Sequence, residues 1–168
     1  TKKLKPREWD KVAVIDGSRE IGGYYTISIG NALIYVDALN GNDTTGTGKK
    51  EKPFKTISKG VSVADDGCTI KVAEGPYDNE GTFNNEVLID DLNINLLGAG
   101  IGRSTIALYG GISIKDSKEV KIMGFTLTTG TDSGSGSGGI GLSNSEVSII
   151  SNEFNKCGGA GIGLIDNS

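Results

Sequence analysis

The residues of this 168-residue chain that could bind or act on another molecule are mostly carboxylates. Asp and Glu number 21 against 17 Lys and Arg, and the chain contains no histidine. Histidine is the most common metal ligand and the side chain that most readily exchanges protons near neutral pH. Its absence disfavours zinc sites and serine-triad catalysis.

Acidic and amide residues recur at one place in successive stretches of the chain. Asp116, Asn144 and Asp166 each follow an apolar segment, and Glu119 and Glu146 each precede the next one. Such a column could bind a polysaccharide, or its side chains could bond the backbone of turns and face water. The candidate carbohydrate-binding residues are Asp116, Glu119, Glu146 and, as a stacking platform for a sugar ring, Tyr109. No catalytic residue is assigned.

Three further groups of residues are weaker candidates. The turn from Asp37 to Asp43 resembles a calcium loop, but its spacing lacks the bidentate Glu of the twelve-residue EF-hand. We interpret it as a set of Asx turns. Asp90 and Asp91 are a candidate calcium or sugar contact, and Arg103 lies in a turn with no acidic cluster beside it in the sequence.

The elements that must position these residues are short apolar strands that return about every 25 residues, a period typical of stacked coils. One set of strands begins at Ile70, Ile94, Val120 and Val147. A second set begins at Val87, Ile112, Ile140 and Ile162. Apolar residues at alternate positions, with turns rich in Gly, Asn and Ser, indicate a β-solenoid. The alternative is an antiparallel sandwich with coincidental spacing.

The repeat also predicts which residues stack inside the solenoid. We expect one inward column of Ile70, Ile94, Val120 and Val147, and a second of Val72, Leu96, Ile122 and Ile149. Cys68 and Cys157 would lie three coils apart, too far for a disulfide, and are expected as free thiols. The Gly-Ser segment 130–139 is predicted to be a surface turn between coils.

Composition excludes two classes of partner. The net charge of −4 disfavours a nucleic-acid groove, which requires clustered positive charge. No stretch approaches the roughly 20 apolar residues of a membrane-spanning helix. We therefore expect no nucleic-acid binding and no membrane insertion.

A second pattern opens the repeat region. It consists of Tyr35, Val36, Gly41, Asp43, Gly46, Thr47, Pro53, Phe54, Thr56, Ile57, Ala64, Gly67, Thr69, Ile70, Val72, Gly75 and Tyr77. Over residues 34–168 the chain resembles the pectin-lyase-like right-handed parallel β-helix superfamily, most of all the β-helix proteins of bacteriophage tail spikes and tail fibres. The expected fold is thus all-β, a right-handed parallel β-helix (solenoid) with a short N-terminal capping α-helix.

The capping helix has its own signals in the sequence. Pro53 suits the first turn of a helix, and Phe54, Ile57, Val61 and Ala64 follow as one apolar stripe. Asp66-Gly67 is the predicted end of the helix. In the superfamily that the chain resembles, such a helix closes the N-terminal end of the solenoid.

Two parts are predicted. Residues 1–33 are expected to form an N-terminal arm and a small β attachment segment, with strands over Lys11–Ile15 and Tyr24–Ile29. Residues 34–168 are expected to form the N-terminal part of a parallel β-helix that is truncated at its C-terminus. The chain begins with Thr and stops in mid-repeat, so we expect a longer native chain or a partner subunit over the open end.

The resemblance implies a function. It suggests a structural bacteriophage tail-spike or tail-fibre component that faces host surface polysaccharide, located in the virion. It implies a homotrimer that contacts other tail proteins through its arm. Alternatives are a secreted polysaccharide lyase or epimerase, which on this fold uses acidic calcium ligands with an Arg or Lys base, and a non-catalytic bacterial surface adhesin. We expect no catalysis within this stretch and no cofactor or metal, with calcium left open.

Overall fold

The computed structural model describes residues 19–21, 24–26, 32–81, 85–128 and 138–164 of the chain. The chain divides into two compact units, Thr1–Ala32 and Leu33–Ser168. In the first unit, β1 (Arg19–Ile21) and β2 (Tyr24–Thr26) pair as an antiparallel hairpin. The strand predicted over Lys11–Ile15 lies outside the described residues.

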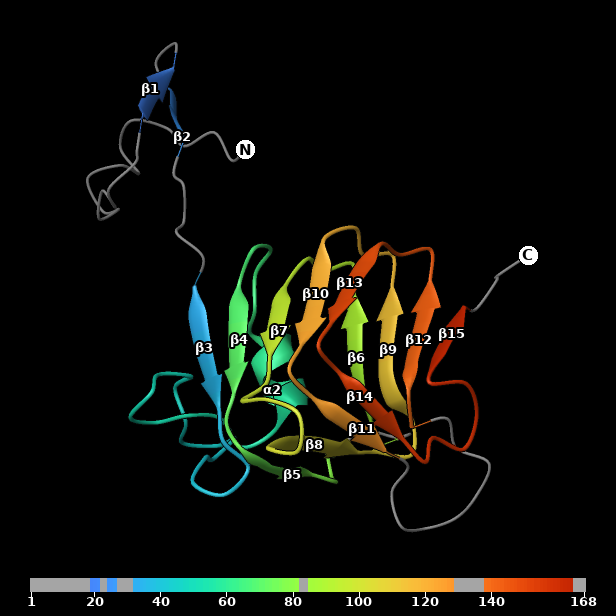
Figure 1. Ribbon diagram of the computed structural model, residues 1–168. Helices are drawn as coiled ribbons and strands as arrows, with labels where there is room; N and C mark the ends of the chain where they lie inside the picture. The colour runs from blue at the N-terminus through green and yellow to red at the C-terminus, as the bar shows by residue number, and fades with distance from the viewer. Residues whose placement is uncertain (1–18, 22–23, 27–31, 82–84, 129–137, 165–168) are drawn as a thin grey trace. The chain divides into compact units, whose positions relative to one another are not determined.

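The second unit is built from three parallel sheets, and successive strands enter them in rotation (Figure 1). The first sheet contains β3 (Leu33–Val36), β4 (Thr69–Val72), β7 (Asn95–Leu97), β10 (Val120–Met123) and β13 (Val147–Ile150). The second sheet contains β5 (Gly75–Tyr77), β8 (Ser104–Ala107), β11 (Thr126–Thr128) and β14 (Glu153–Asn155). The third sheet contains β6 (Glu86–Asp90), β9 (Gly111–Lys115), β12 (Ile140–Ser143) and β15 (Ile162–Leu164). The predicted β-solenoid, a parallel β-helix, is therefore confirmed.

The register confirms one predicted stack and corrects another. In the third sheet, Val87, Ile112, Ile140 and Ile162 align as predicted. In the first sheet, Ile70 pairs with Leu96 instead of Ile94, so the first coil is shifted by two residues. Side chains alternate with a period of two, and a shift of two keeps the same residues inside. The apolar pattern alone therefore could not distinguish the two registers.

The interior is a continuous stack of aliphatic and aromatic side chains. Leu96, Ile106, Ile122 and Phe125 are fully buried. Each coil contributes only a few such residues, and neighbouring coils cover them on both sides. Cys68 belongs to this core, whereas Cys157 is half-buried, and both are free thiols as expected from their separation.

At the turns that lead into the third sheet, neighbouring coils lie too close for a side chain to fit. Gly111 and Gly139 precede the paired residues Ile112 and Ile140, and Gly161 precedes Ile162 in the same column. A Cβ on Gly111 would overlap the carbonyl oxygen of Gly139, and a Cβ on Gly139 would overlap that of Gly161. The glycine column therefore lets three successive coils approach closely at this corner.

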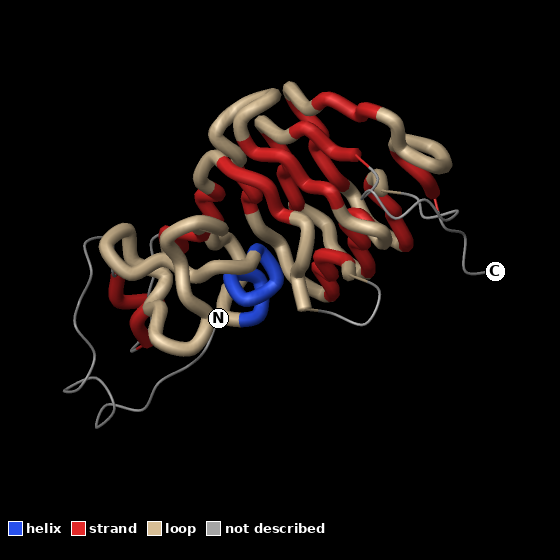
Figure 2. The backbone as a smooth tube through the Cα atoms, turned by 90° about the horizontal axis from the view of Figure 1, so that it is seen from below, coloured by secondary structure: helices blue, strands red, loops and turns tan. Residues whose placement is uncertain are grey.

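The helix α2 (Ile57–Ser62) lies at the end of the stack formed by the earliest strands (Figure 2). The predicted cap is confirmed, but its boundaries were wrong. Thr56 is the N-cap, its hydroxyl accepting from Lys59 N at 3.1 Å, and the helix ends before Val63. Phe54 instead pairs with β3, donating from its N–H to Tyr35 O at 3.0 Å. Phe54 also forms a parallel bridge with Val36, and the helix begins after this pairing.

Among the described residues, no helix is long and apolar enough to cross a membrane.

Candidate functional site

The predicted acidic residues lie at the turn that leads from the third sheet to the first sheet of the next coil. Asp116 follows β9 and Asn144 follows β12, and the pairing of Lys115 with Ser143 aligns them. Asp91 occupies the same place one coil earlier, because Asp90 pairs with Lys115. We call the set Asp91, Asp116, Glu119, Asn144 and Glu146 the acidic edge.

The column within the acidic edge has an unusual backbone. Asp91, Asp116 and Asn144 have φ values of 48°, 50° and 46°. Asp and Asn tolerate this left-handed conformation better than most residues. The Asn144 side-chain amide donates to Asp116 Oδ1 at 2.6 Å, linking two coils. Part of the column is therefore used to hold the turns together, as the alternative interpretation of these residues expected, while Asp116 remains exposed.

Glu119 and Glu146 complete the acidic edge. They precede Val120 and Val147, which pair between β10 and β13, and both are exposed. The Oδ1 of Asn93 accepts from Glu119 N at 3.0 Å, and Ser117 O accepts from Glu146 N at 2.9 Å. These carboxylates face solvent on a rigid turn. Asp166, the remaining member of the predicted column, lies outside the described residues.

Tyr109 does not join the acidic edge. It lies between β8 and β9 and is half exposed, whereas Asp116 lies at the opposite end of β9. Five residues of strand separate the two positions, which at about 3.3 Å per residue is roughly 16 Å. The structure thus brings Asp116, Glu119 and Glu146 together and places Tyr109 on another corner.

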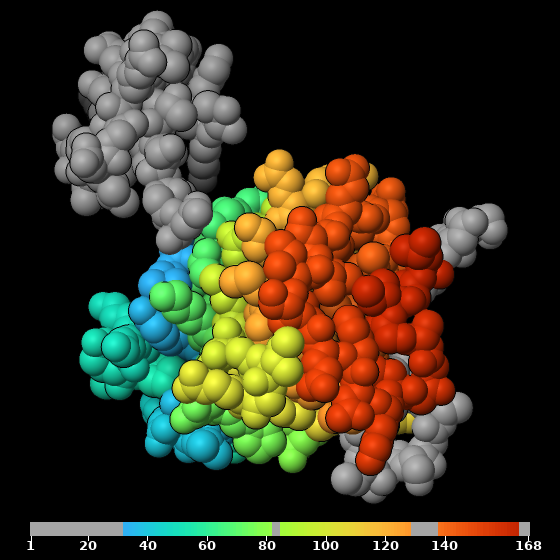
Figure 3. Space-filling view, viewed as in Figure 1, coloured from blue at the N-terminus to red at the C-terminus, as the bar shows by residue number. Residues whose placement is uncertain are grey.

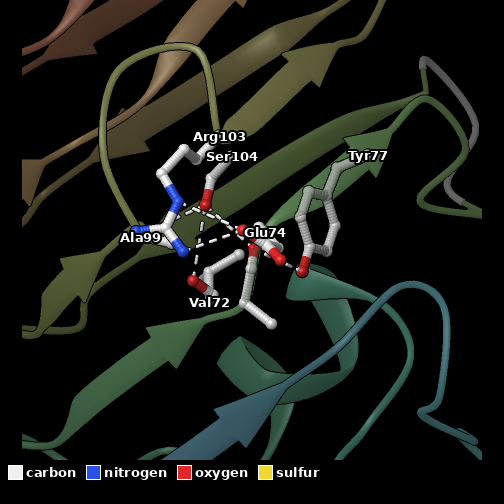
Figure 4. A network of polar contacts seen from close by, with 7 residues as sticks. Val72, Glu74, Tyr77, Ala99, Arg103 and Ser104 are labelled. Atoms are coloured by element: carbon white, nitrogen blue, oxygen red, sulfur yellow. Dashed lines mark hydrogen bonds and ion pairs between the residues drawn. The ribbon is translucent and has the colours of Figure 1, made fainter.

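Arg103 has an acidic partner that the sequence did not reveal. Its guanidinium forms an ion pair with Glu74, with Nη2 2.8 Å and Nε 3.1 Å from Oε2 (Figure 4). The two residues are 29 positions apart but precede Ser104 and Gly75, which pair between β8 and β5. Both side chains are more than 60% exposed, so the pair lies on the surface of the solenoid.

The same corner contains a buried polar network (Figure 4). The carbonyl oxygen of Ala73 accepts from Tyr77 Oη at 3.1 Å and from Ser104 Oγ at 2.9 Å. Ser104 Oγ in turn accepts from Ala99 N at 2.8 Å. Burial raises the pKa of Tyr77 to about 12, so its phenol stays protonated and donates at neutral pH. Tyr77 is thus a core residue, 2% exposed.

A buried carboxylate that no sequence pattern predicted lies against the capping helix. Glu80 is 4% exposed, and its Oε2 accepts from Ser58 N in the first turn of α2. Oε1 has no hydrogen-bond partner. Burial raises the pKa of Glu80, although the hydrogen bonds from Ser58 oppose the shift. A lone Glu in a Gly- and Asn-rich loop has no pattern from which its burial could be predicted.

The opening turn is made of Asx turns, as predicted. Asp37 Oδ1 accepts from the N–H groups of Leu39 and Asn40, each at 2.9 Å. Burial opposes ionisation of Asp37, but hydrogen bonds from Asn40 and Leu39 outweigh it and lower the pKa of this carboxyl. Asp43 accepts from the N–H groups of Lys55 and Thr56. In the described part of the chain, no three His, Cys, Asp or Glu residues are arranged to hold a metal ion.

Residues 39–111 match a known family model. That family is described as "Protein of unknown function (DUF1565)". The match begins in the opening turn and ends at the start of β9, so it includes Glu80, while Asp116, Glu119 and Glu146 lie beyond it. No curated protein and no solved structure matches the chain.

Sequence reasoning also missed a groove on the outer face of the first sheet. It has a volume of about 530 Å³ and is lined by Tyr35, Lys50, Pro53, Lys71, Leu97 and Met123, among others. One signal was present in the sequence. Leu96-Leu97 and Ile122-Met123 each place two apolar residues in succession, so one of each pair must face outward. We call this feature the first-sheet groove.

Proposed function

We propose that the chain is a structural β-helical segment of a bacteriophage tail spike or tail fibre, with its acidic edge facing host surface polysaccharide. The observation that carries the proposal is the stacking of acidic residues on neighbouring coils, with Asp91 aligned to Asp116 and Glu119 aligned to Glu146. Parallel strands lie about 4.8 Å apart, so a glycan that follows the solenoid would meet Asp91, Asp116 and Asn144 on three successive coils. Ionised carboxylates accept hydrogen bonds from sugar hydroxyls.

Binding without cleavage is the better-supported role for this stretch. Glycoside hydrolysis needs two carboxyl groups across a substrate, one with a raised pKa. The raised pKa belongs to Glu80, which is buried against α2 and lies in a different corner from the acidic edge. Arg103, the candidate base of a lyase, is paired with Glu74 on the surface.

The virion location, the homotrimer and the contact of the N-terminal arm with other tail proteins are parts of the same proposal. Their support is the resemblance of residues 34–168 to the pectin-lyase-like β-helix superfamily, to which tail spikes, polysaccharide lyases and surface proteins all belong, together with the basic N-terminal arm that carries Trp9. Mass spectrometry of purified virions would test the location, and light scattering of the full chain would test the trimer. A product found on the bacterial surface and missing from virions would favour an adhesin that uses the same edge.

The binding test uses substitutions that keep the turn intact. Asp116→Asn, Glu119→Gln and Glu146→Gln remove charge, and Asn retains the left-handed backbone that Ala would strain. Asp65→Asn, on an exposed turn outside the edge, is the matched control. The triple variant should bind host polysaccharide about ten-fold more weakly, equivalent to roughly 1.4 kcal/mol, with an unchanged urea midpoint. Unchanged binding would refute the assignment of the edge, and lost folding would show that its role is structural.

A further inference from the structure

A pocket lies where the opening turn, the start of α2 and the residues after β5 meet. It has a volume of about 470 Å³ and is lined by Ala38, Asp43, Lys55, Pro76, Asp78 and Glu80, among others. In the space-filling view, the blue residues of the opening turn and the green residues around β5 lie side by side (Figure 3). Its volume falls within the range of small-molecule sites. We call this feature the cap pocket.

Glu80 gives the cap pocket an unsatisfied acceptor. The residue is 4% exposed, its Oε2 accepts from Ser58 N, and its own N–H donates to Asn85 Oδ1 at 2.8 Å. These bonds hold both its side chain and its backbone in place. Its Oε1 is the one buried side-chain oxygen or nitrogen without a hydrogen-bond partner in the part of the chain that the structure describes. A buried acceptor without a donor bears the full cost of desolvation, so a ligand that supplies the donor gains affinity.

The charge of the cap pocket indicates that this donor is a cation. Asp43, Asp78 and Glu80 line the pocket against one lysine, Lys55. Burial and, to a smaller extent, the charge of Asp43 raise the pKa of Glu80, so the two carboxylates are close enough to interact. Like charges that share a site disfavour ionisation, and a bound cation would offset this repulsion.

The lining of the pocket favours an organic cation over a metal ion. Calcium takes roughly six to eight oxygen ligands, and no three acidic residues in the described ranges are arranged to hold a metal ion. Asp43 is already engaged, since its carboxylate accepts from Lys55 N, Thr56 N and Thr56 Oγ1. A primary ammonium brings its own three donors. Ala38 and Pro76 also line the pocket and offer apolar surface to a methylene stem.

We propose that the cap pocket binds a primary alkylammonium group, the group that ends a lysine side chain or a free diamine. The ammonium donates to Glu80 Oε1 and lies beside Asp78, with its methylene stem against Ala38 and Pro76. This site is separate from the acidic edge, because the pocket adjoins β5 of the second sheet, whereas the edge leads from the third sheet to the first. The inference goes beyond the proposed function and does not depend on it.

The experiment titrates the full chain at pH 8 and low salt with Nα-acetyl-lysine methylamide. The matched ligand is its Nε-acetylated form, in which a neutral amide replaces the ammonium. We expect the charged form to bind at least about ten-fold more tightly, as for a hydrogen bond between charged groups. Because Oε1 is itself buried, entry of the ammonium must displace neighbouring residues slightly. Amide NMR signals of Ser58 and Gly81 should therefore shift.

A parallel titration identifies the source of the ammonium. It uses 1,5-diaminopentane, which has the same aliphatic ammonium without a peptide backbone. Tighter binding of the diamine than of the lysine derivative would identify a free diamine as the ligand. The reverse order would identify a lysine of a partner protein. Both orders agree with the proposal, provided that the amides of Ser58 and Gly81 shift.

Three variants test the residues of the cap pocket. Glu80→Gln keeps the size of the side chain and should weaken binding of the lysine derivative at least about ten-fold. Asp78→Asn leaves the buried carboxylate in place and should weaken binding about three-fold, in the range of an exposed ion pair. Asp65→Asn removes the same charge from an exposed turn outside the pocket and should bind as the wild type does. If Glu80→Gln does not fold, the comparison of Asp78→Asn with Asp65→Asn decides.

Three outcomes would overturn the assignment. The first is equal affinity for the charged and the Nε-acetylated lysine derivatives. The second is the same affinity in Asp65→Asn as in the pocket variants, which would indicate a general charge effect or none. The third is that calcium chloride alone shifts the amides of Ser58 and Gly81 and displaces the lysine derivative, which would make the pocket a metal site.

Discussion

The glycine column at the start of the third-sheet strands provides the sharpest test of the coil register. We predict that Gly111→Ala strongly destabilises the solenoid. Gly111 has φ = 66°, a conformation that costs an L-residue about 1–2 kcal/mol. Its Cβ would also overlap the Gly139 carbonyl oxygen, which accepts from Ile112 N at 2.9 Å. Relief of the overlap must separate two coils or break that bond.

The expected magnitude follows from these parts. Loss of the hydrogen bond costs about 1 kcal/mol, and overpacking costs about 1–3 kcal/mol. Together with the backbone term, Gly111→Ala should lower the free energy of unfolding by roughly 3–6 kcal/mol, a large share of the 5–15 kcal/mol typical of domains. The Cβ that Gly139→Ala adds would overlap the carbonyl oxygen of Gly161, but Gly139 does not have a positive φ. It should therefore cost roughly 1–2 kcal/mol less.

The assay is urea unfolding of the full chain, followed by far-UV circular dichroism. Gly163→Ala is the matched control, since β15 leaves nothing within 4 Å of the added Cβ. We expect the control to unfold within about 0.5 kcal/mol of the wild type, as surface substitutions usually do. If Gly111→Ala and Gly163→Ala unfold at the same urea concentration, the close approach of the coils is wrong. If Gly111→Ala does not fold, Gly139→Ala provides the comparison.

Two further predictions concern charged residues. Because burial raises the pKa of Glu80, its contribution to stability is fully present below about pH 4.5 and is lost as pH rises through the folded-state pKa. Glu80→Gln should therefore gain in urea midpoint relative to the wild type as pH rises from 4 to 8, and a difference independent of pH would contradict the assigned burial. For the exposed Arg103–Glu74 pair, a double-mutant cycle of Arg103→Gln and Glu74→Gln should give a coupling below about 1 kcal/mol that shrinks with salt. A coupling of several kcal/mol would show that the corner is desolvated.

The strands of the first and third sheets could be predicted because their pattern is local. Apolar residues alternate within each strand, and the strands return at a nearly constant interval. The strands of the second sheet were missed. They have three or four residues each, such as Gly75–Tyr77 and Thr126–Thr128, and so few residues do not establish a period.

Some positions that depend on the neighbouring coil could not be predicted. The partner of Ile70 was wrong by two residues because both registers bury the same face. The ion pair of Arg103 with Glu74 joins residues that are 29 positions apart in the sequence. They become neighbours only because β5 and β8 pair in the folded chain. The alignment of the acidic edge could be predicted from the repeat, because Asp116 follows β9 and Glu119 precedes β10, and the repeat already indicated the register of these strands with the next coil.

The sequence by itself determined that the chain is a solenoid, because alternation and repetition are properties of the chain that hold in any register. It also determined the Asx turns and the separation of the thiols, which depend on near neighbours and on coil count. The tertiary structure decided where α2 begins, because β3 competes for Phe54. It also decided that Glu80 is buried and that Leu97 and Met123 form a groove with Lys50. The burial of Glu80 and the shape of the groove depend on segments that are distant in the sequence, so no local pattern predicts them.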